Sequence, residues 1–182
     1  VVLTDFSVRA GRLVYEPAPF SDSELPAKLS WNFQGPRPAF LRDWGSYKLN
    51  TVEQVPEGMK ITRQAKVDNS EQAVGYALNG GLAGDFEFTL DYRNFTSTRV
   101  QTDWRVPRMT ISASINSVED PQQSVESAAV TLRRNHSGDL RLLAVSGRME
   151  SEGKMGYKTI ESPTDQDGLR LRLVRQGTSM FY

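Results

Sequence analysis

The chain has 182 residues, of which 38% are hydrophobic and 24% are charged, a balance typical of one folded domain with a sizeable core. Its 22 basic residues are matched by 22 acidic ones, and this zero net charge argues against nucleic-acid binding, which normally shows as a basic excess. Because the chain lacks cysteine and any long apolar run, disulfides, thiolate metal sites, cysteine nucleophiles and membrane insertion are excluded.

The first segment, residues 1–19, contains two strand-like stretches, 6–8 and 12–15, separated near Gly11. We expect a hairpin there, which either adds to the edge of the following domain or links it to a preceding one. Residues 21–29 then allow only a helical turn or two, because Pro26 limits a helix.

From residue 20 to residue 182 the dominant pattern has a period of two, which is typical of half-buried strands. Apolar and polar residues alternate without a break in residues 86–92, 109–115 and 169–173. Further strand candidates are residues 47–52, 58–63, 73–78, 128–133 and 140–145. Roughly ten short strands, separated by turns rich in Gly, Asn, Asp and Pro, predict one all-β sandwich or barrel.

The two ends suggest a piece of a longer protein. The chain starts without Met, and it ends on Met180-Phe-Tyr182 just after a strand and a turn. We therefore expect further domains in the parent protein, and a β domain truncated at its C-terminus.

Three stretches in a fixed order carry a family resemblance. They are residues 57–61 (Glu-Gly-Met-Lys-Ile) after a Trp-containing lead-in, residues 80–92 (Gly-Gly-Leu-Ala-Gly-Asp-Phe-Glu-Phe-Thr-Leu-Asp-Tyr) and residues 167–177 (Asp-Gly-Leu-Arg-Leu-Arg-Leu-Val-Arg-Gln-Gly). Residues 20–182 thereby resemble the concanavalin A-like lectin/glucanase superfamily, in particular laminin-G-like domains of unknown function in large exported bacterial proteins, such as those of planctomycetes. The resemblance implies an antiparallel two-sheet jelly-roll sandwich and an exported location, which is periplasmic, cell-surface or secreted. Its motifs are structural, so they support a fold and not an activity.

Glucanases of this superfamily carry a Glu-x-Asp-x-x-Glu strand with its carboxylates in the cleft. The nearest string here is residues 85–91, in which Asp85, Glu87 and Asp91 share one strand face. The spacing of the family is not reproduced, and ordinary outward-facing polar residues explain the pattern. Glu87 and Asp91 are therefore only weak catalytic candidates.

Aromatic platforms beside polar side chains would indicate sugar binding, because sugar rings stack on exposed aromatic faces. Trp31, Trp44 and Trp104 all lie in sequence contexts typical of loops. Two of them have acids and arginines close by. The predicted ligand-binding residues are Trp44, Asp43, Trp104, Asp103 and Arg105. The competing interpretation is that these tryptophans fill the core.

A calcium ion needs only carboxylate and carbonyl oxygens, and Asp165 and Asp167 before Gly168 are candidate ligands, as are Glu119 and Asp120. Asp and Gly are also ordinary turn formers, so calcium stays an option and no other cofactor is expected.

The arginines form a further pattern: Arg133, Arg141, Arg170 and Arg172 would line one sheet face if their strands were neighbours, and a polar or anionic ligand could use such a stripe. A solvated outer face paired with Glu residues explains the same arginines equally well. The single histidine, His136, lies in a turn, and no nucleophile motif accompanies it.

These observations predict a non-catalytic carbohydrate-binding or adhesion module whose partner is a polysaccharide or glycan. A divergent glycoside hydrolase or lyase of the same fold, and a purely structural or protein-interaction domain, remain the alternatives.

Overall fold

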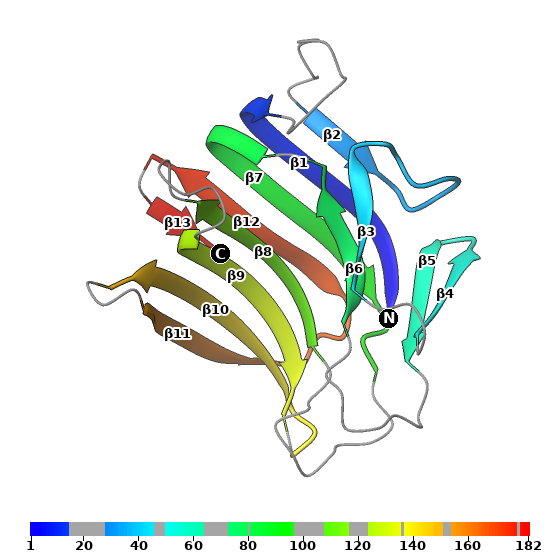
Figure 1. Ribbon diagram of the computed structural model, residues 1–182. Helices are drawn as coiled ribbons and strands as arrows, with labels where there is room; N and C mark the ends of the chain where they lie inside the picture. Colours follow the sequence, from blue (N-terminus) through cyan, green and yellow to red (C-terminus); the bar gives the residue numbers. More distant parts are fainter. Residues whose placement is uncertain are drawn as a thin grey trace.

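The computed structural model describes residues 1–14, 28–45, 50–63, 73–79, 81–96, 108–116, 124–135, 137–150, 154–177 and 179–182. Within these ranges the chain forms β-strands and no helix, which confirms the all-β prediction. The strands form three open sheets, and every pair of neighbouring strands is antiparallel (Figure 1).

The largest sheet has seven strands in the order β13-β12-β7-β1-β5-β4, with β2 also paired to β1. Its members are β1 (Val2–Val14), β2 (Lys28–Trp31), β4 (Asn50–Val55), β5 (Gly58–Arg63), β7 (Gly81–Arg93), β12 (Leu169–Gln176) and β13 (Ser179–Phe181). β7 and β12 confirm two of the uninterrupted alternating stretches. The sheet combines the first and the last strands of the chain.

The N-terminal segment is one long strand, which corrects the expected hairpin. β1 runs antiparallel to β7, with a register shift between Ala10 and Arg12, where the turn was expected. A β-bulge leaves one residue unpaired without reversing the chain, and Gly11 is the residue at this shift. β1 also lies in the interior of the sheet, between β7 and β5, and not at an edge.

The second sheet has four strands in the order β11-β10-β9-β8, so that strands adjacent in the sheet are also consecutive in the sequence. They are β8 (Arg108–Asn116), β9 (Ser124–Arg134), β10 (Leu140–Met149) and β11 (Met155–Thr164). β8 confirms the third alternating stretch, whereas β11 was not expected. The third sheet pairs β3 (Leu41–Gly45) with β6 (Val74–Leu78).

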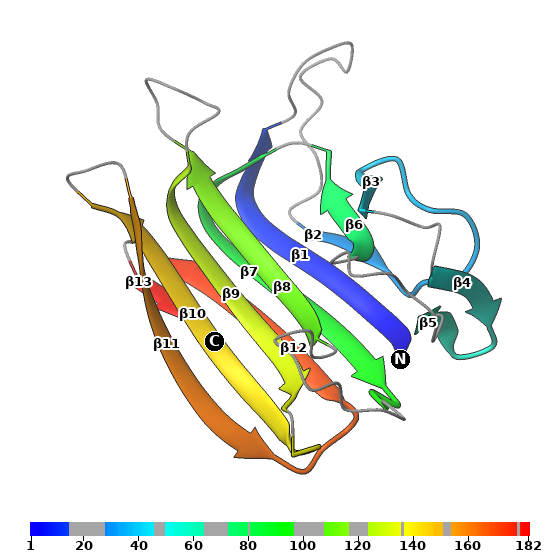
Figure 2. The same ribbon diagram turned by 60° about the horizontal axis from the view of Figure 1, so that its bottom comes forward.

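The core lies between the two larger sheets, which are layered with β12 facing β8 and β9 (Figure 2). Leu171 and Leu173 of β12 belong to the same buried cluster as Ile111, Val130 and Leu132 of the four-stranded sheet. Full burial of such a side chain contributes about 1.5–3 kcal/mol, so this shared cluster holds the two layers together.

The two-stranded sheet covers an aromatic part of the core. Trp31 of β2 lies 4.6 Å from Phe33 and 5.3 Å from Tyr76 of β6, measured between ring centroids. Trp31 is only 5% exposed, and its Nε1 donates a hydrogen bond to the carbonyl oxygen of Gln34. It therefore fills the core from a strand and is no exposed loop platform.

Candidate functional site

Glu87 and Asp91 of β7 have their carboxylates on the face that points away from the core. Phe88, next to Glu87 in the sequence, is buried on the opposite face of the strand. Arg172 on the neighbouring strand β12 donates from Nη2 to Oε2 of Glu87 at 3.0 Å. Arg170 donates to both carboxylate oxygens of Asp91, at 2.6 and 2.8 Å. The two weak catalytic candidates are thus both held in ion pairs on the open face of the large sheet.

The electrostatics at Glu87 favour its charged form. The hydrogen bond from Arg172 is the main cause that lowers the pKa of Glu87 below its ordinary value of 4.5, and the positive charges of Arg172, Arg9 and Arg170 lower it further. A general acid needs the opposite shift, toward the working pH. Asp91 lies four residues along the same strand, about 13 Å away at Cα, whereas paired catalytic carboxyl groups lie about 5–9.5 Å apart.

Asp85, the third acid on this face, has a structural partner. Its Oδ1 accepts a hydrogen bond of 2.7 Å from the backbone N–H of Gly177. Gly177 has a φ of +58° and follows β12 directly, so Asp85 fixes the start of the turn into β13.

Trp44 lies in β3 and is 54% exposed, which places a large aromatic ring at the surface. Its partner across the two-stranded sheet is Gly75, and the Cε3 edge of the indole lies above the position that a side chain of Gly75 would occupy. Because a glycine leaves this position open, the indole can lie across the neighbouring strand.

Asp43 does not share the face of Trp44, because consecutive side chains of a strand point to opposite sides. It pairs in register with Tyr76 on the core side and forms an ion pair with Arg37 at 3.3 Å. Arg42 is the neighbouring residue that alternation puts on the same face as Trp44. The predicted Trp44–Asp43 unit is therefore split between two faces.

Trp104, Asp103 and Arg105, the other predicted ligand-binding residues, lie outside the described residues, as do His136, Glu119 and Asp120.

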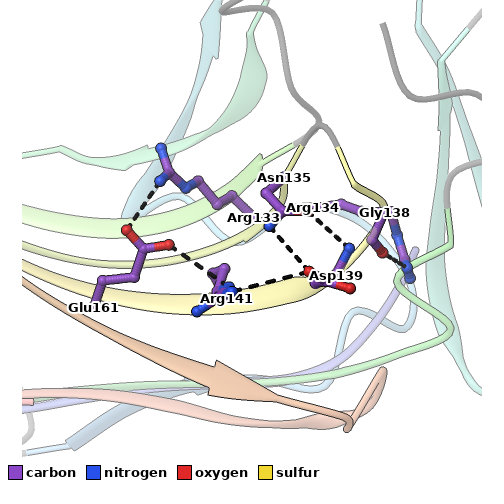
Figure 3. A network of polar contacts seen from close by, with 7 residues as sticks. All are labelled: Arg133, Arg134, Asn135, Gly138, Asp139, Arg141 and Glu161. Carbon is purple, nitrogen blue, oxygen red and sulfur yellow. Dashed lines mark hydrogen bonds and ion pairs between the residues drawn. The ribbon is translucent and has the colours of Figure 1, made fainter.

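An open hollow lies at one end of the four-stranded sheet and has a volume of about 790 Å³. It opens between the β9–β10 turn and the loop that joins β11 to β12. Its charged lining residues are Arg134, Asp139, Arg141, Asp165 and Asp167. Figure 3 shows Arg141 between Asp139 and Glu161, at 3.9 Å from a carboxylate oxygen of each.

The two predicted calcium ligands, Asp165 and Asp167, both line this hollow. The described residues contain no group of three or more His, Cys, Asp or Glu side chains arranged to hold a metal ion. A second hollow of about 590 Å³ also includes Asp167 in its lining, so the β11–β12 loop separates two adjoining depressions.

Arg134, Asp139 and Arg141, which line this hollow together with Asp165 and Asp167, were not predicted as part of a site. Both bordering turns are recognisable in the sequence by their Asn, Asp and Gly residues. Their proximity follows from the pairing of β10 with β11, in which Arg141 is opposite Pro163 and Leu140 is opposite Thr164. A prediction of β11 would have placed Arg141 beside this loop.

The four arginines do not form one stripe, and each is paired with a carboxylate, as the alternative interpretation expects. Arg170 and Arg172 belong to β12 of the seven-stranded sheet, whereas Arg133 and Arg141 belong to the four-stranded sheet. The two pairs therefore lie on different sheets, and each finds carboxylates of its own sheet.

A family model described as "Protein of unknown function (DUF1583) C domain" matches residues 21–182. No curated protein and no solved structure matches the chain. In the parts that the structure describes, no helix is long and apolar enough to span a membrane.

Proposed function

The chain belongs to the DUF1583 C domain family, a family of unknown function, and we propose that it is a non-catalytic carbohydrate-binding or adhesion module of a larger exported protein. The observation that carries this proposal is the exposed indole of Trp44 on the outer side of β3. Sugar rings present apolar C–H faces that stack on such a ring, and large aromatic side chains are normally buried.

Two features support a binding role over catalysis. Glu87 and Asp91 are held by arginines, and the pKa of Glu87 is lowered, which suits a charged structural group better than a proton donor. Their separation along one strand is also too wide for a pair that acts on one glycosidic bond.

The finer fold assignment is part of the proposal. Two layered antiparallel sheets with a shared core are compatible with a concanavalin A-like jelly roll, the fold that the sequence resemblance implies. One fold can host many unrelated functions, so the function must be argued from the site. An exported location belongs to the same proposal. Calcium at Asp165 and Asp167 is a competing proposal for that place, and the arm of the array with chelator tests it.

A polysaccharide and glycan array with the purified chain tests the proposal, run once with calcium and once with a chelator. We expect binding to a defined glycan and loss of that binding in Trp44→Ala. Trp104→Ala tests the second predicted tryptophan in the same way. Loss of binding with chelator alone would add a bound metal.

Tyr157→Ala provides the matched control, because Tyr157 is an equally large aromatic, 65% exposed, on β11 of another sheet. It should leave glycan binding intact. Silence of the wild-type chain under both conditions would overturn the proposal that Trp44 forms a sugar platform and would favour a structural or protein-binding role for this surface.

A further inference from the structure

We propose that the hollow between the β9–β10 turn and the β11–β12 loop is a second ligand site, which binds a neutral, hydroxyl-rich ring such as one sugar residue through hydrogen bonds. This inference deepens the proposed function and rests on it, but it concerns other residues than Trp44. The volume of about 790 Å³ lies within the range of about 300–1,000 Å³ that is typical of small-molecule sites.

The walls of the hollow are held by their own hydrogen bonds. In the β9–β10 turn, the backbone N–H of Asp139 donates to Oδ1 of Asn135 at 2.8 Å, and Arg134 donates to the carbonyl oxygen of Gly138. On the other side, the carbonyl oxygen of Asp167 accepts from the backbone N–H of Phe95 at 2.9 Å. Hydrogen bonds therefore hold backbone groups on both sides of the hollow, and backbone order of this kind lowers the entropic cost of binding.

Several charged groups in this hollow lack close partners. Among the described residues, the carboxylates of Asp165 and Asp167 have no hydrogen bond and no ion pair, although Asp167 acts electrostatically on Tyr92. Arg141 has no hydrogen bond within the same set, and its two ion pairs, at 3.9 Å, exceed the roughly 3.2 Å limit of a good N–H···O contact. Donors and acceptors that lack close partners among the described residues therefore line the same hollow.

The balance of charges selects the ligand class. The described lining residues supply three carboxylates (Asp139, Asp165 and Asp167) and two guanidinium groups (Arg134 and Arg141). An anion would be repelled by the carboxylates, and a cation would be repelled by the arginines. A hydroxyl group can donate to a carboxylate and accept from a guanidinium at the same time, so a polyol uses both kinds of wall without adding charge.

None of the described lining residues is aromatic, so recognition by these residues depends on hydrogen bonds and not on stacking. Trp44 offers the reverse, an exposed ring whose strand neighbour Asp43 points to the other face. Trp44 would bind a polysaccharide by stacking and the hollow would bind it by hydrogen bonds, and each site can be tested without the other.

The test is an NMR titration of the full 182-residue chain, labelled with nitrogen-15, with methyl α-glucopyranoside, methyl α-mannopyranoside and methyl β-galactopyranoside. At least one of these should cause saturable shifts of backbone amides in residues 137–141 and 164–168. Asp165→Ala, Asp167→Ala and Arg141→Met should each weaken this binding by about tenfold or more, the loss expected for one charge-assisted hydrogen bond.

Glu57→Ala is the matched control, because Glu57 is an exposed acid in the turn between β4 and β5, and it should leave the affinity unchanged. Trp44→Ala should also leave these shifts unchanged, which separates this site from the platform. A failed glycan array would thus refute the platform alone, and the titration would still decide on the hollow.

Three results would overturn the proposal. The first is the absence of shifts in both turns of the wild-type chain with all three glycosides, a result that needs no variant to fold. The second is binding of glucuronic acid or inorganic phosphate as tight as that of the neutral glycosides, because the arginines alone would then govern recognition. The third is saturable binding of calcium chloride alone at these residues, which would make the carboxylates metal ligands.

Discussion

Arg170 donates two hydrogen bonds to Asp91, from Nε to Oδ1 at 2.6 Å and from Nη2 to Oδ2 at 2.8 Å. The two residues are register partners on β12 and β7, so the backbone pairing brings them side by side. Such a two-point contact fixes the orientation of both side chains as well as their distance. The hydrogen bonds to Asp91 are the main cause that raises the pKa of Arg170 above its ordinary value, and the negative charges of Asp91, Asp5 and Glu87 raise it further.

Asp91→Asn should lower the melting temperature slightly, and more at low than at high salt. The pair lies on the surface, with 62% of the Arg170 side chain exposed, so ions in solution screen it. Thermal unfolding of the wild type and the variant at two salt concentrations measures the difference. An equal loss at both would mean that the carboxylate acts through its hydrogen bonds to Arg170 and not through long-range charge.

Glu87 gives a prediction for acid conditions. Its pKa in the folded chain is lowered below 4.5, chiefly by the hydrogen bond from Arg172, so its contribution to the free energy of unfolding is complete above pH 4.5. This contribution is lost as the pH falls through the lower, folded value. Urea unfolding over this range should show a flatter loss of stability for Glu87→Gln than for the wild type.

Glu57→Gln, which alters an acid in the exposed β4–β5 turn, should leave the acid profile of the wild type unchanged. Parallel curves for the wild type and Glu87→Gln would show that Glu87 titrates alike in the folded and unfolded chains.

Tyr92 gives a prediction for alkaline conditions, in which stability is lost as the pH rises. Its side chain is 1% exposed, and its hydroxyl group has no hydrogen-bond partner among the described residues. Burial first, and then the charge of Asp167, raise the pKa of Tyr92 from 10 to about 12. The stabilisation that comes from keeping this hydroxyl neutral is therefore complete below pH 10 and is lost as the pH rises toward 12.

Tyr92→Phe should consequently be neutral, or stabilising by up to about 1 kcal/mol at pH 7, because it removes a buried polar atom that lacks a partner. Its stability should also fall less steeply above pH 10. Urea unfolding measures both effects. A loss of more than about 1 kcal/mol would mean that the hydroxyl group has a hydrogen-bond partner.

Gly58 and Gly35 form a matched pair of backbone positions. Both have positive φ, +147° and +70°, but a Cβ on Gly58 would lie 2.0 Å from the carbonyl oxygen of Leu3, whereas a Cβ on Gly35 meets nothing within 4 Å. Gly58→Ala should cost more than about 2 kcal/mol, and Gly35→Ala about 1 kcal/mol from strain alone. Denaturant unfolding ranks the two, and equal losses would contradict the collision at β1.

The strands that could be predicted are those with one buried and one solvated face. Residues 86–92 alternate because Phe88 and its apolar neighbours face the core while Glu87 and Asp91 face solvent. β11 could not be found in this way, because it is an edge strand whose residues from Tyr157 to Pro163 are exposed on both faces. Without a buried face, its sequence has no period to detect.

The candidate sites were harder to predict, since they depend on pairings between distant strands. The sequence around Trp44 indicated a polar aromatic site, but a strand at this position places Asp43 on the opposite face. The hollow near Asp165 needs the neighbouring turn that carries Asp139, and only the pairing of β10 with β11 brings the two together. Composition and spacing contain no information on either relationship.

The interior position of β1 bears on how the chain reaches its fold. The four-stranded sheet is built from hairpins of successive strands and can form locally. The large sheet cannot form locally, because Ser7 of β1 must meet Thr89 of β7, which lies 82 positions further along the chain. β12, which pairs with the other edge of β7, lies further still along the sequence. Such distant pairings close large loops and slow folding. A chain that began at residue 21 would lack the central strand on which three others pair, and its folding would stall there.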